Sequence, residues 1–132
     1  MTVKIDTKEK FHVLTPMETA LSENMTEEFR QLLLDCLKKE VKNVVLNLGN
    51  VTLLDQQIAE TMLNCQQEFY EQQYSFVICE MKPEVEQFFD DKEMLDLINY
   101  TPTESEAWDI VQMEEIEREL MDGDDFEFDK SE

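Results

Sequence analysis

The sequence predicts a single α/β domain, with a mixed sheet of four to five strands and about four helices packed mainly on one face. Two short, almost continuous apolar runs, at 43–48 and 76–79, are typical of strands that helices cover. Apolar residues between these runs recur at steps of three and four, which is the period of an amphipathic helix. A strand, a helix and a strand in this order indicate a βαβ unit with parallel strands and a right-handed crossover. At 132 residues, one domain is expected.

The chain begins with a predicted β-hairpin. Val3 and Ile5 alternate with polar residues, and a second β-prone run extends from Phe11 to Thr15. The residues at 7–10 form the loop between the two runs, and Pro16 ends the second run.

A first helix is predicted over 24–39. Asn24 and Glu27 have the spacing of a capping pair, and Lys38 and Lys39 complement the negative end of the helix dipole. The apolar stripe of this helix consists of Met25, Phe29, Leu32, Leu33, Cys36 and Leu37. The strand at 43–48 follows it.

After the Gly49-Asn50 turn, a second helix is predicted from Asp55 to Gln73. Its apolar stripe consists of Ile58, Met62, Cys65 and Phe69. The strand at 76–79 then completes the βαβ unit.

The last third of the chain is less regular. Pro83 opens a short helix, because a proline in the first helical turn sacrifices no hydrogen bond. A brief edge strand is predicted at Leu95–Ile98. Thr103 and Glu106 form a capping box that starts a last helix, which Gly123 ends.

The charge of the chain narrows the classes of partner. The formal net charge is −21, from 32 acidic and 11 basic residues. Such a surface repels nucleic-acid phosphates and anionic lipid headgroups, so neither nucleic-acid binding nor direct membrane insertion is expected. No apolar run approaches the roughly 20 residues that span a bilayer, and the polar start of the chain lacks a signal-peptide core. A cytoplasmic location is expected.

The domain is assigned to residues 1–121, and residues 122–132 are expected to form a disordered acidic tail. Three roles of this tail stay open. It is a solubilising end, a segment that folds onto a basic partner with Phe126 and Phe128 as anchors, or a cover for a site on the domain.

Residues suited to catalysis or cofactor binding are scarce. His12 is the sole histidine, and its place in a predicted strand indicates a structural role. The three cysteines lie within apolar patterns and are interpreted as reduced, buried side chains; they are Cys36, Cys65 and Cys79. The sequence has two glycines and contains no nucleophile motif, phosphate-binding loop or Cys/His metal spacing. The chain is therefore predicted not to be an enzyme, and no cofactor or metal is expected.

The candidate site is the stretch LLDQQIAE at 53–60, which follows the predicted strand at 43–48 and its turn and opens the second helix. Helix starts of this kind often bind ligands and partners in α/β proteins. Asp55 is also a favourable N-cap, and its carboxylate complements the positive end of the helix dipole. Two interpretations stay open: a helix cap with no further role, or a binding site that includes Gln56 and Gln57.

The order of elements and several segments resemble the STAS family, the fold of bacterial anti-sigma-factor antagonists. The run VVLNL, followed by GNVTLLDQQI, is similar to the family pattern of an apolar strand, a linker and Asp-Ser-Ser-Gly opening a helix, with Asp55 on the family Asp. The segment CEMKPEVEQFF resembles the family segment that contains Ser-Pro-x-Val, and Leu21-Ser22 falls where the family has Leu-Asp before its first helix. The resemblance covers about residues 3–120 and implies a STAS-like fold and a protein-binding role.

The sequence departs from the family at the centre of this motif. Gln56 stands at the position of the phosphoacceptor serine, Gln57 at that of the second serine and Ile58 at that of the glycine. In phosphorylatable members, a partner kinase phosphorylates the serine and the antagonist then releases its partner, but an amide accepts no phosphate. Isoleucine also fills space where the backbone of a partner would approach. Thr52 and Thr61 are the nearby hydroxyls, and Thr61 lies one turn into the helix, where a kinase has less access.

Two functions follow from the resemblance. In the first, the chain is a regulatory module whose Asp55, Gln56, Gln57 and Ile58 dock a protein partner of the anti-sigma-factor or kinase type, without a phosphorylation switch. The neutral Gln56 then resembles the unphosphorylated, binding-competent state. In the second, the site has decayed and the domain is an accessory subunit of a membrane transport or lipid-trafficking complex.

Overall fold

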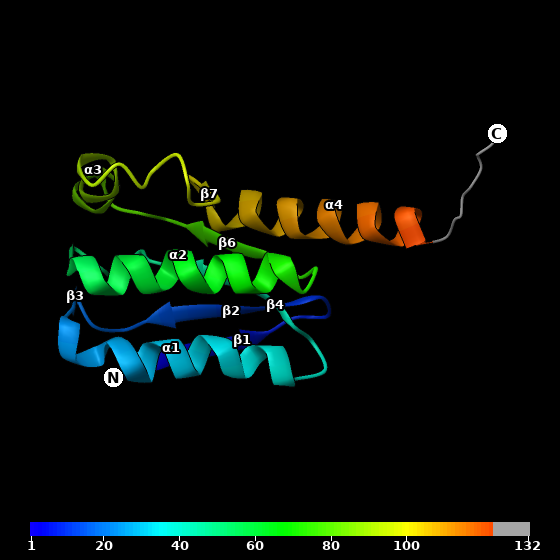
Figure 1. Cartoon of the computed structure of the whole chain (residues 1–132), viewed down its shortest axis with the longest axis horizontal. Coiled ribbons are helices and arrows are strands. Elements are labelled where there is room, and N and C mark those ends of the chain that lie inside the picture. The colour runs from blue at the N-terminus through cyan, green and yellow to red at the C-terminus, as the bar shows by residue number, and fades with distance from the viewer. Residues whose placement is uncertain (123–132) are drawn as a thin grey trace.

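The computed structural model describes residues 1–122, which form a five-stranded mixed sheet (Figure 1). The strand order is β1-β2-β4-β6-β7. The predicted hairpin pairs β1 (Val3–Thr7) with β2 (Phe11–Pro16) in antiparallel orientation. The remaining pairs in this sheet are parallel and add β4 (Asn43–Asn47), β6 (Phe76–Cys79) and β7 (Tyr100–Thr101). The prediction of a mixed sheet is thus confirmed.

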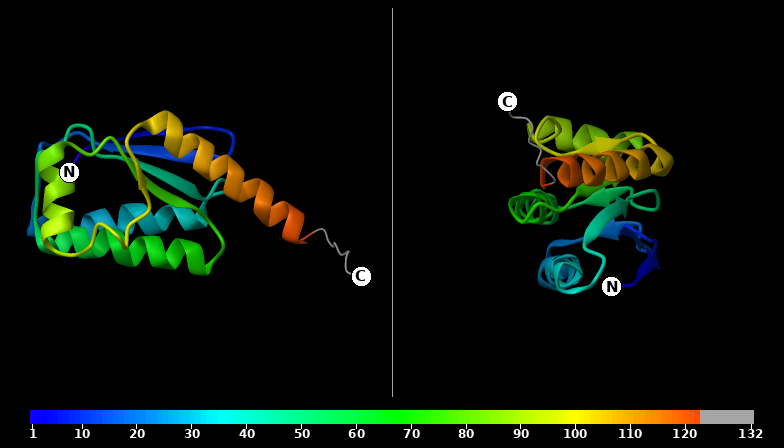
Figure 2. Two further views of the ribbon diagram at one scale, coloured as in Figure 1. Left: turned by 90° about the horizontal axis from the view of Figure 1, so that it is seen from above. Right: turned by 90° about the vertical axis from the view of Figure 1, so that its right-hand side faces the viewer.

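Helices cover both faces of this sheet. The α-helices are α1 (Thr26–Asp35), α2 (Gln56–Glu71), α3 (Pro83–Asp91) and α4 (Glu104–Asp122), and 3₁₀ turns η1 (Glu23–Met25) and η2 (Cys36–Lys38) flank α1. Two of them, α1 and α2, lie side by side on one face, and α4 lies against the other (Figure 2). Residues of α3 belong to the same core as those of α1 and α2, so the helices lie mainly on one face, as predicted.

The two cores follow from the alternation of side chains along the strands. In β4, Val44 and Leu46 belong to the larger core, under α1, α2 and α3, whereas Val45 belongs to the smaller core, under α4. Strands buried on both faces read as continuous apolar runs, which explains the sequence pattern of β4 and β6. The smaller core consists of Phe11, Val13, Val45, Val77, Cys79, Ala107 and Val111.

The first helix is shorter than predicted. The regular α-helix ends at Asp35, and the flanking turns of the predicted range are 3₁₀. The capping pair of Asn24 and Glu27 does not form, because Asn24 Oδ1 accepts a hydrogen bond of 2.6 Å from the hydroxyl of Ser22. The N-cap residue of α1 is Met25, whose side chain makes no capping hydrogen bond.

The prediction of an edge strand at Leu95–Ile98 is wrong, because the edge strand is β7, two residues further on. Residues 94–98 form a turn in which the N–H of Ile98 donates to the carbonyl of Met94 at 3.2 Å. Both side chains are buried. In a helical turn, two residues four positions apart share a face, and the residue midway between them lies elsewhere. In a strand, all three would lie on the same face. The two buried side chains therefore fit a helical turn.

The start of α4 agrees in part with the predicted capping box, because the carboxylate of Glu106 accepts from the hydroxyl of Thr103 and not from its backbone N–H. The N–H of Glu106 donates to Thr103 Oγ1 at 3.2 Å, and the Thr103 hydroxyl donates to Glu106 Oε1 at 2.9 Å. The predicted helix end at Gly123 and nearly all of the acidic tail lie outside the described residues. Within residues 1–122, no helix is both long enough and apolar enough to cross a membrane.

Candidate functional site at the start of α2

A second, two-stranded parallel sheet supports the start of α2. It pairs β3 (Ala20–Leu21) with β5 (Leu53–Leu54) and has no counterpart among the predicted strands. Leu21 and Leu54 are buried, whereas the side chain of Leu53 is 64% exposed. This pairing brings the segment before α1 alongside the segment before α2.

Asp55 links these two segments. It occupies the N-cap position of α2 with an extended backbone (φ −82°, ψ 156°), but its side chain makes no hydrogen bond to α2. Its Oδ2 instead accepts a hydrogen bond of 2.7 Å from the N–H of Glu23, and its own N–H donates to the carbonyl of Leu21 at 3.0 Å. Asp55 therefore occupies the predicted N-cap position of α2, but its carboxylate does not bond the N–H groups of α2 as predicted. The carboxylate instead caps η1, which leads into α1, and it also lies at the positive end of the α2 dipole.

Gln56 and Gln57 occupy the first turn of α2, and both are exposed. The amide of Gln56 donates to Glu60 Oε2 at 3.0 Å. Together with Glu23, Asp55 and Glu60, the two glutamines line an open hollow of about 430 Å³. Among residues 1–122, this lining holds three carboxylates and two amides but no cationic side chain. This surface therefore suits a partner that offers N–H donors or basic side chains.

Ile58 does not belong to this surface. Its side chain is 0% exposed and forms part of the larger core. The prediction that Ile58 contacts a partner is corrected on this point, because the third residue of α2 falls on the apolar stripe that faces the sheet. The isoleucine fills the core and leaves the exposed surface to the two glutamines.

Neither nearby threonine takes the place of a phosphoacceptor at the helix start. Thr61 is 5% exposed, and its hydroxyl donates to the carbonyl of Gln57 at 2.9 Å. Thr52 is exposed, but it precedes β5 and its hydroxyl donates to the carbonyl of Thr19 at 3.3 Å. The exposed positions in the first turn of α2 carry only the amides of Gln56 and Gln57.

Two exposed apolar side chains near the site were not among the predicted site residues. Leu53 directly precedes the buried Leu54, and Met17, which is 50% exposed, lies in the loop after β2. Asn50 ties that loop to the one after β4, because its amide donates to the carbonyl of Pro16 at 3.2 Å. Adjacent side chains of a strand point to opposite faces, so Leu53 points away from the core that buries Leu54.

His12 has the structural role that the sequence indicated. Its Nε2 lies 2.6 Å from the carbonyl of Val41, which can only accept, so this nitrogen carries the proton. The hydroxyl of Thr7 then donates to Nδ1 at 2.8 Å. Burial lowers the pKa of His12 from its ordinary value of 6.5, and the ring is neutral at physiological pH.

The three cysteines are all free and buried. Burial raises the pKa of each thiol, and that of Cys65 reaches about 11. A protonated, inaccessible thiol is a poor nucleophile and a poor metal ligand. In the part of the chain that the structure describes, no three His, Cys, Asp or Glu side chains come together in an arrangement that could hold a metal ion.

Comparisons with known proteins agree with the fold described above. The family model of the STAS domain matches residues 3–107. No curated protein shows a significant match to the chain. An anti-sigma-factor antagonist (STAS) domain protein from Planctomyces limnophilus superposes with a TM-score of 0.72 at 17% identity, over 83% of this chain and 97% of that one.

Two further structures show the range of proteins that share this fold. The Bacillus cell fate determinant SpoIIAA, in its phosphorylated form, gives a TM-score of 0.62 at 15% identity over 83% of this chain and 99% of that one. The murine Solute Carrier 26 family member A9 anion transporter gives 0.65 at 13% identity, over 78% of this chain and 18% of the transporter. At these identities, the likeness shows the fold alone, and the predicted fold class is confirmed.

Proposed function

Because the chain belongs to the STAS domain family, we propose that it is a non-enzymatic regulatory module that docks a protein partner at the start of α2 without a phosphorylation switch. The observation that carries the proposal is the pair of exposed amides, Gln56 and Gln57, at the helix start where phosphorylatable STAS proteins present a serine.

The docking surface is held in place before any partner arrives. Asp55 is tied to both Glu23 and Leu21, so the start of α2 is fixed against the start of η1. A preorganised surface loses little conformational entropy on binding. The exposed Leu53 supplies an apolar contact beside the polar hollow, which matches the apolar centre and polar rim of protein interfaces.

The amides keep this surface in one charge state. A phosphate at position 56 would add a charge of about −1.5 to −2 beside Asp55 and Glu60, and the added repulsion would alter docking. Gln56 accepts no phosphate and stays neutral, so the surface stays in the state that resembles an unphosphorylated antagonist. Control of the interaction then depends on the supply or the state of the partner.

The partner is expected to be a cytoplasmic protein with a basic contact surface. The net charge of −21 and the carboxylates of Glu23, Asp55 and Glu60 all favour a cationic counterpart. Such complementarity accelerates association and makes it sensitive to salt.

Affinity capture from the native cell tests the proposal. The immobilised chain is compared with a Gln56→Ala/Gln57→Ala variant and with Gln67→Ala, a matched control at an exposed position of the same helix. We expect one protein to be retained by the parent and by the control and to be lost with the double variant. Retention of the same proteins by all three would place the docking surface elsewhere.

A second candidate is an accessory STAS subunit of a membrane transport or lipid-trafficking complex. The observation that favours it is the likeness to the murine anion transporter, part of which has this fold. In that case, the captured protein is a membrane ATPase or transporter subunit, and the glutamine substitutions leave its capture unchanged.

A further inference from the structure

The outer face of α4 carries an apolar stripe that no described residue covers. Met113, Ile116 and Leu120 are 59%, 56% and 64% exposed. Their spacings of three and four residues place them on one line along the helix. Met121, beside this line, is 83% exposed. Single exposed apolar side chains are ordinary, but three in register on one helix face form a continuous patch.

The helix cannot turn this stripe inward, because its opposite face is already fixed. Ala107 and Val111 fill the smaller core near the start of α4. Further along, Asn43 donates to Glu115 Oε2 at 2.6 Å, and Arg118 donates to Ser75 Oγ at 2.8 Å. These bonds hold the second half of α4 against the starts of β4 and β6, with the stripe facing away from the sheet.

The stripe is separate from the surface at the start of α2. It lies on the face of the sheet opposite α1 and α2, and the end of α4 projects beyond the sheet (Figure 2). It also lies beyond the match to the STAS family model, which ends at residue 107.

The charges around the stripe indicate what it binds. Residues 104–119 of α4 contain seven acidic residues and one basic residue, Arg118. Asp109 continues the line of the stripe toward the helix start, and the exposed Glu117 and Glu119 flank it. A second copy of this chain would set two such acidic rims against each other, which repels.

We propose that the stripe of Met113, Ile116 and Leu120 on α4 docks an amphipathic helix of a partner protein, with apolar residues at helical spacing and Lys or Arg along both sides. The apolar residues pack on the stripe, and the basic residues pair with the acidic rim. With this surface, the chain binds one partner on each face of its sheet.

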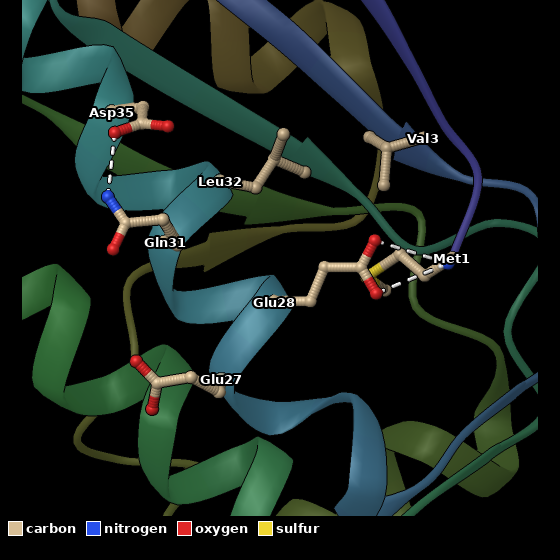
Figure 3. A pocket seen from close by; sticks show the side chains of 7 residues that line it. All are labelled: Met1, Val3, Glu27, Glu28, Gln31, Leu32 and Asp35. Carbon is tan, nitrogen blue, oxygen red and sulfur yellow. Dashed lines mark hydrogen bonds and ion pairs between the residues drawn. The ribbon is translucent and has the colours of Figure 1, made fainter.

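A groove elsewhere is the alternative place for a basic segment. Between β1 and α1 lies an open groove of about 500 Å³, with Val3 and Leu32 at its floor and Glu27, Glu28 and Asp35 around it (Figure 3). The terminal amine of Met1 already pairs with Glu28 at 3.3 Å in this groove. The groove therefore serves as the competing site in the experiment.

The test uses a synthetic peptide of about 18 residues, with Leu at steps of three and four and Lys elsewhere, and a scrambled peptide of the same composition. Fluorescence anisotropy measures binding of both to the full chain. We expect the patterned peptide to bind at least about tenfold tighter than the scrambled one. The Ile116→Ser/Leu120→Ser variant should lose this difference, while Leu97→Ser, at another exposed leucine, should keep it.

The proposal would be overturned by equal binding of both peptides to the parent chain, or by an Ile116→Ser/Leu120→Ser variant that binds the patterned peptide as tightly as the parent does. A loss of binding on Leu32→Ser instead would assign the peptide to the groove. A dimer of the parent chain that the double substitution dissociates, or a large gain in affinity on removal of residues 123–132, would assign the stripe to a different occupant. Circular dichroism of each variant confirms that the fold is intact.

Discussion

The carboxylate of Asp55 accepts a hydrogen bond of 2.7 Å from the backbone N–H of Glu23, which lies 32 residues earlier in the chain. This bond connects the start of α2 with the start of η1 and α1, on the two segments that β3 and β5 also join. The residue that the sequence marks as a local helix cap thus acts as a tertiary link, and it fixes the surface on which Gln56 and Gln57 stand.

Asp55→Ala should lower the free energy of unfolding by about 1 kcal/mol, because the N–H of Glu23 loses its acceptor at a helix start. Asp55→Asn should lower it less, since the amide oxygen still accepts. Urea denaturation measures both effects. Asp96→Ala, at an exposed aspartate whose side chain makes no hydrogen bond within residues 1–122, is the control and should change stability by less than about 0.5 kcal/mol. Equal effects of Asp55→Ala and Asp96→Ala would contradict the structural role of Asp55.

Leu53→Ser should weaken partner binding without loss of stability. The side chain is 64% exposed, so its removal leaves no cavity, and we expect unfolding to change by less than about 0.5 kcal/mol. A buried apolar contact in the complex would be lost, which should raise the Kd of the captured partner about fivefold or more. Leu97→Ser, at a leucine that is 57% exposed, serves as the control. If both variants bind as the parent does, Leu53 lies outside the interface.

His12 should make stability depend on pH below 6.5. Burial lowers the pKa of His12 in the folded chain, whereas the unfolded chain keeps the ordinary value of 6.5. Between these two values the unfolded state binds more protons, so the free energy of unfolding falls as the pH falls. The contribution is complete above pH 6.5 and is lost as the pH falls through the folded-state pKa.

Urea denaturation from about pH 7.5 to 5.5 measures this slope. His12→Gln removes the titrating group, so its free energy of unfolding should fall less steeply over the same range, whatever the stability of the variant at pH 7.5. Parallel curves for the parent and the variant would exclude His12 as the source.

The three thiols should be protected in the folded chain. All are buried, and burial raises the pKa of Cys65 to about 11, so little thiolate exists at neutral pH. We expect a thiol reagent such as DTNB to label the native chain only at the rate of global unfolding and to label all three thiols in denaturant. Rapid labelling of the native chain would identify an accessible cysteine and reopen a redox role.

The parts of the fold that sequence could predict are those with a clear apolar pattern. The hairpin from Val3 and the stripe of α2 show the period of their element, and the strands at 43–48 and 76–79 are continuous apolar runs. The pairing of β3 with β5 escaped prediction because two residues have no period. The Leu95–Ile98 segment misled because its apolar residues belong to a turn packed on the core.

The candidate site was predictable in position and only partly in detail. The helix start was found from its junction and from the STAS resemblance, but the partner of Asp55 is 32 residues away and no local pattern encodes it. The burial of Ile58 was available from the sequence, because Ile58 is also part of the apolar stripe of its helix. The exposure of the outer stripe of α4 could not be predicted from the sequence, because that helix has apolar residues both on the face that packs on the sheet and on the opposite face.

The most direct test of the central proposal is the Kd of the captured partner for three chains: the parent, Gln56→Glu and Gln67→Glu. Both substitutions add one negative charge to an exposed position of α2, but only the first adds it to the hollow beside Asp55 and Glu60. We predict that Gln56→Glu raises the Kd at least about tenfold and that Gln67→Glu leaves it unchanged. Equal Kd values for all three chains would show that the partner does not dock at the start of α2.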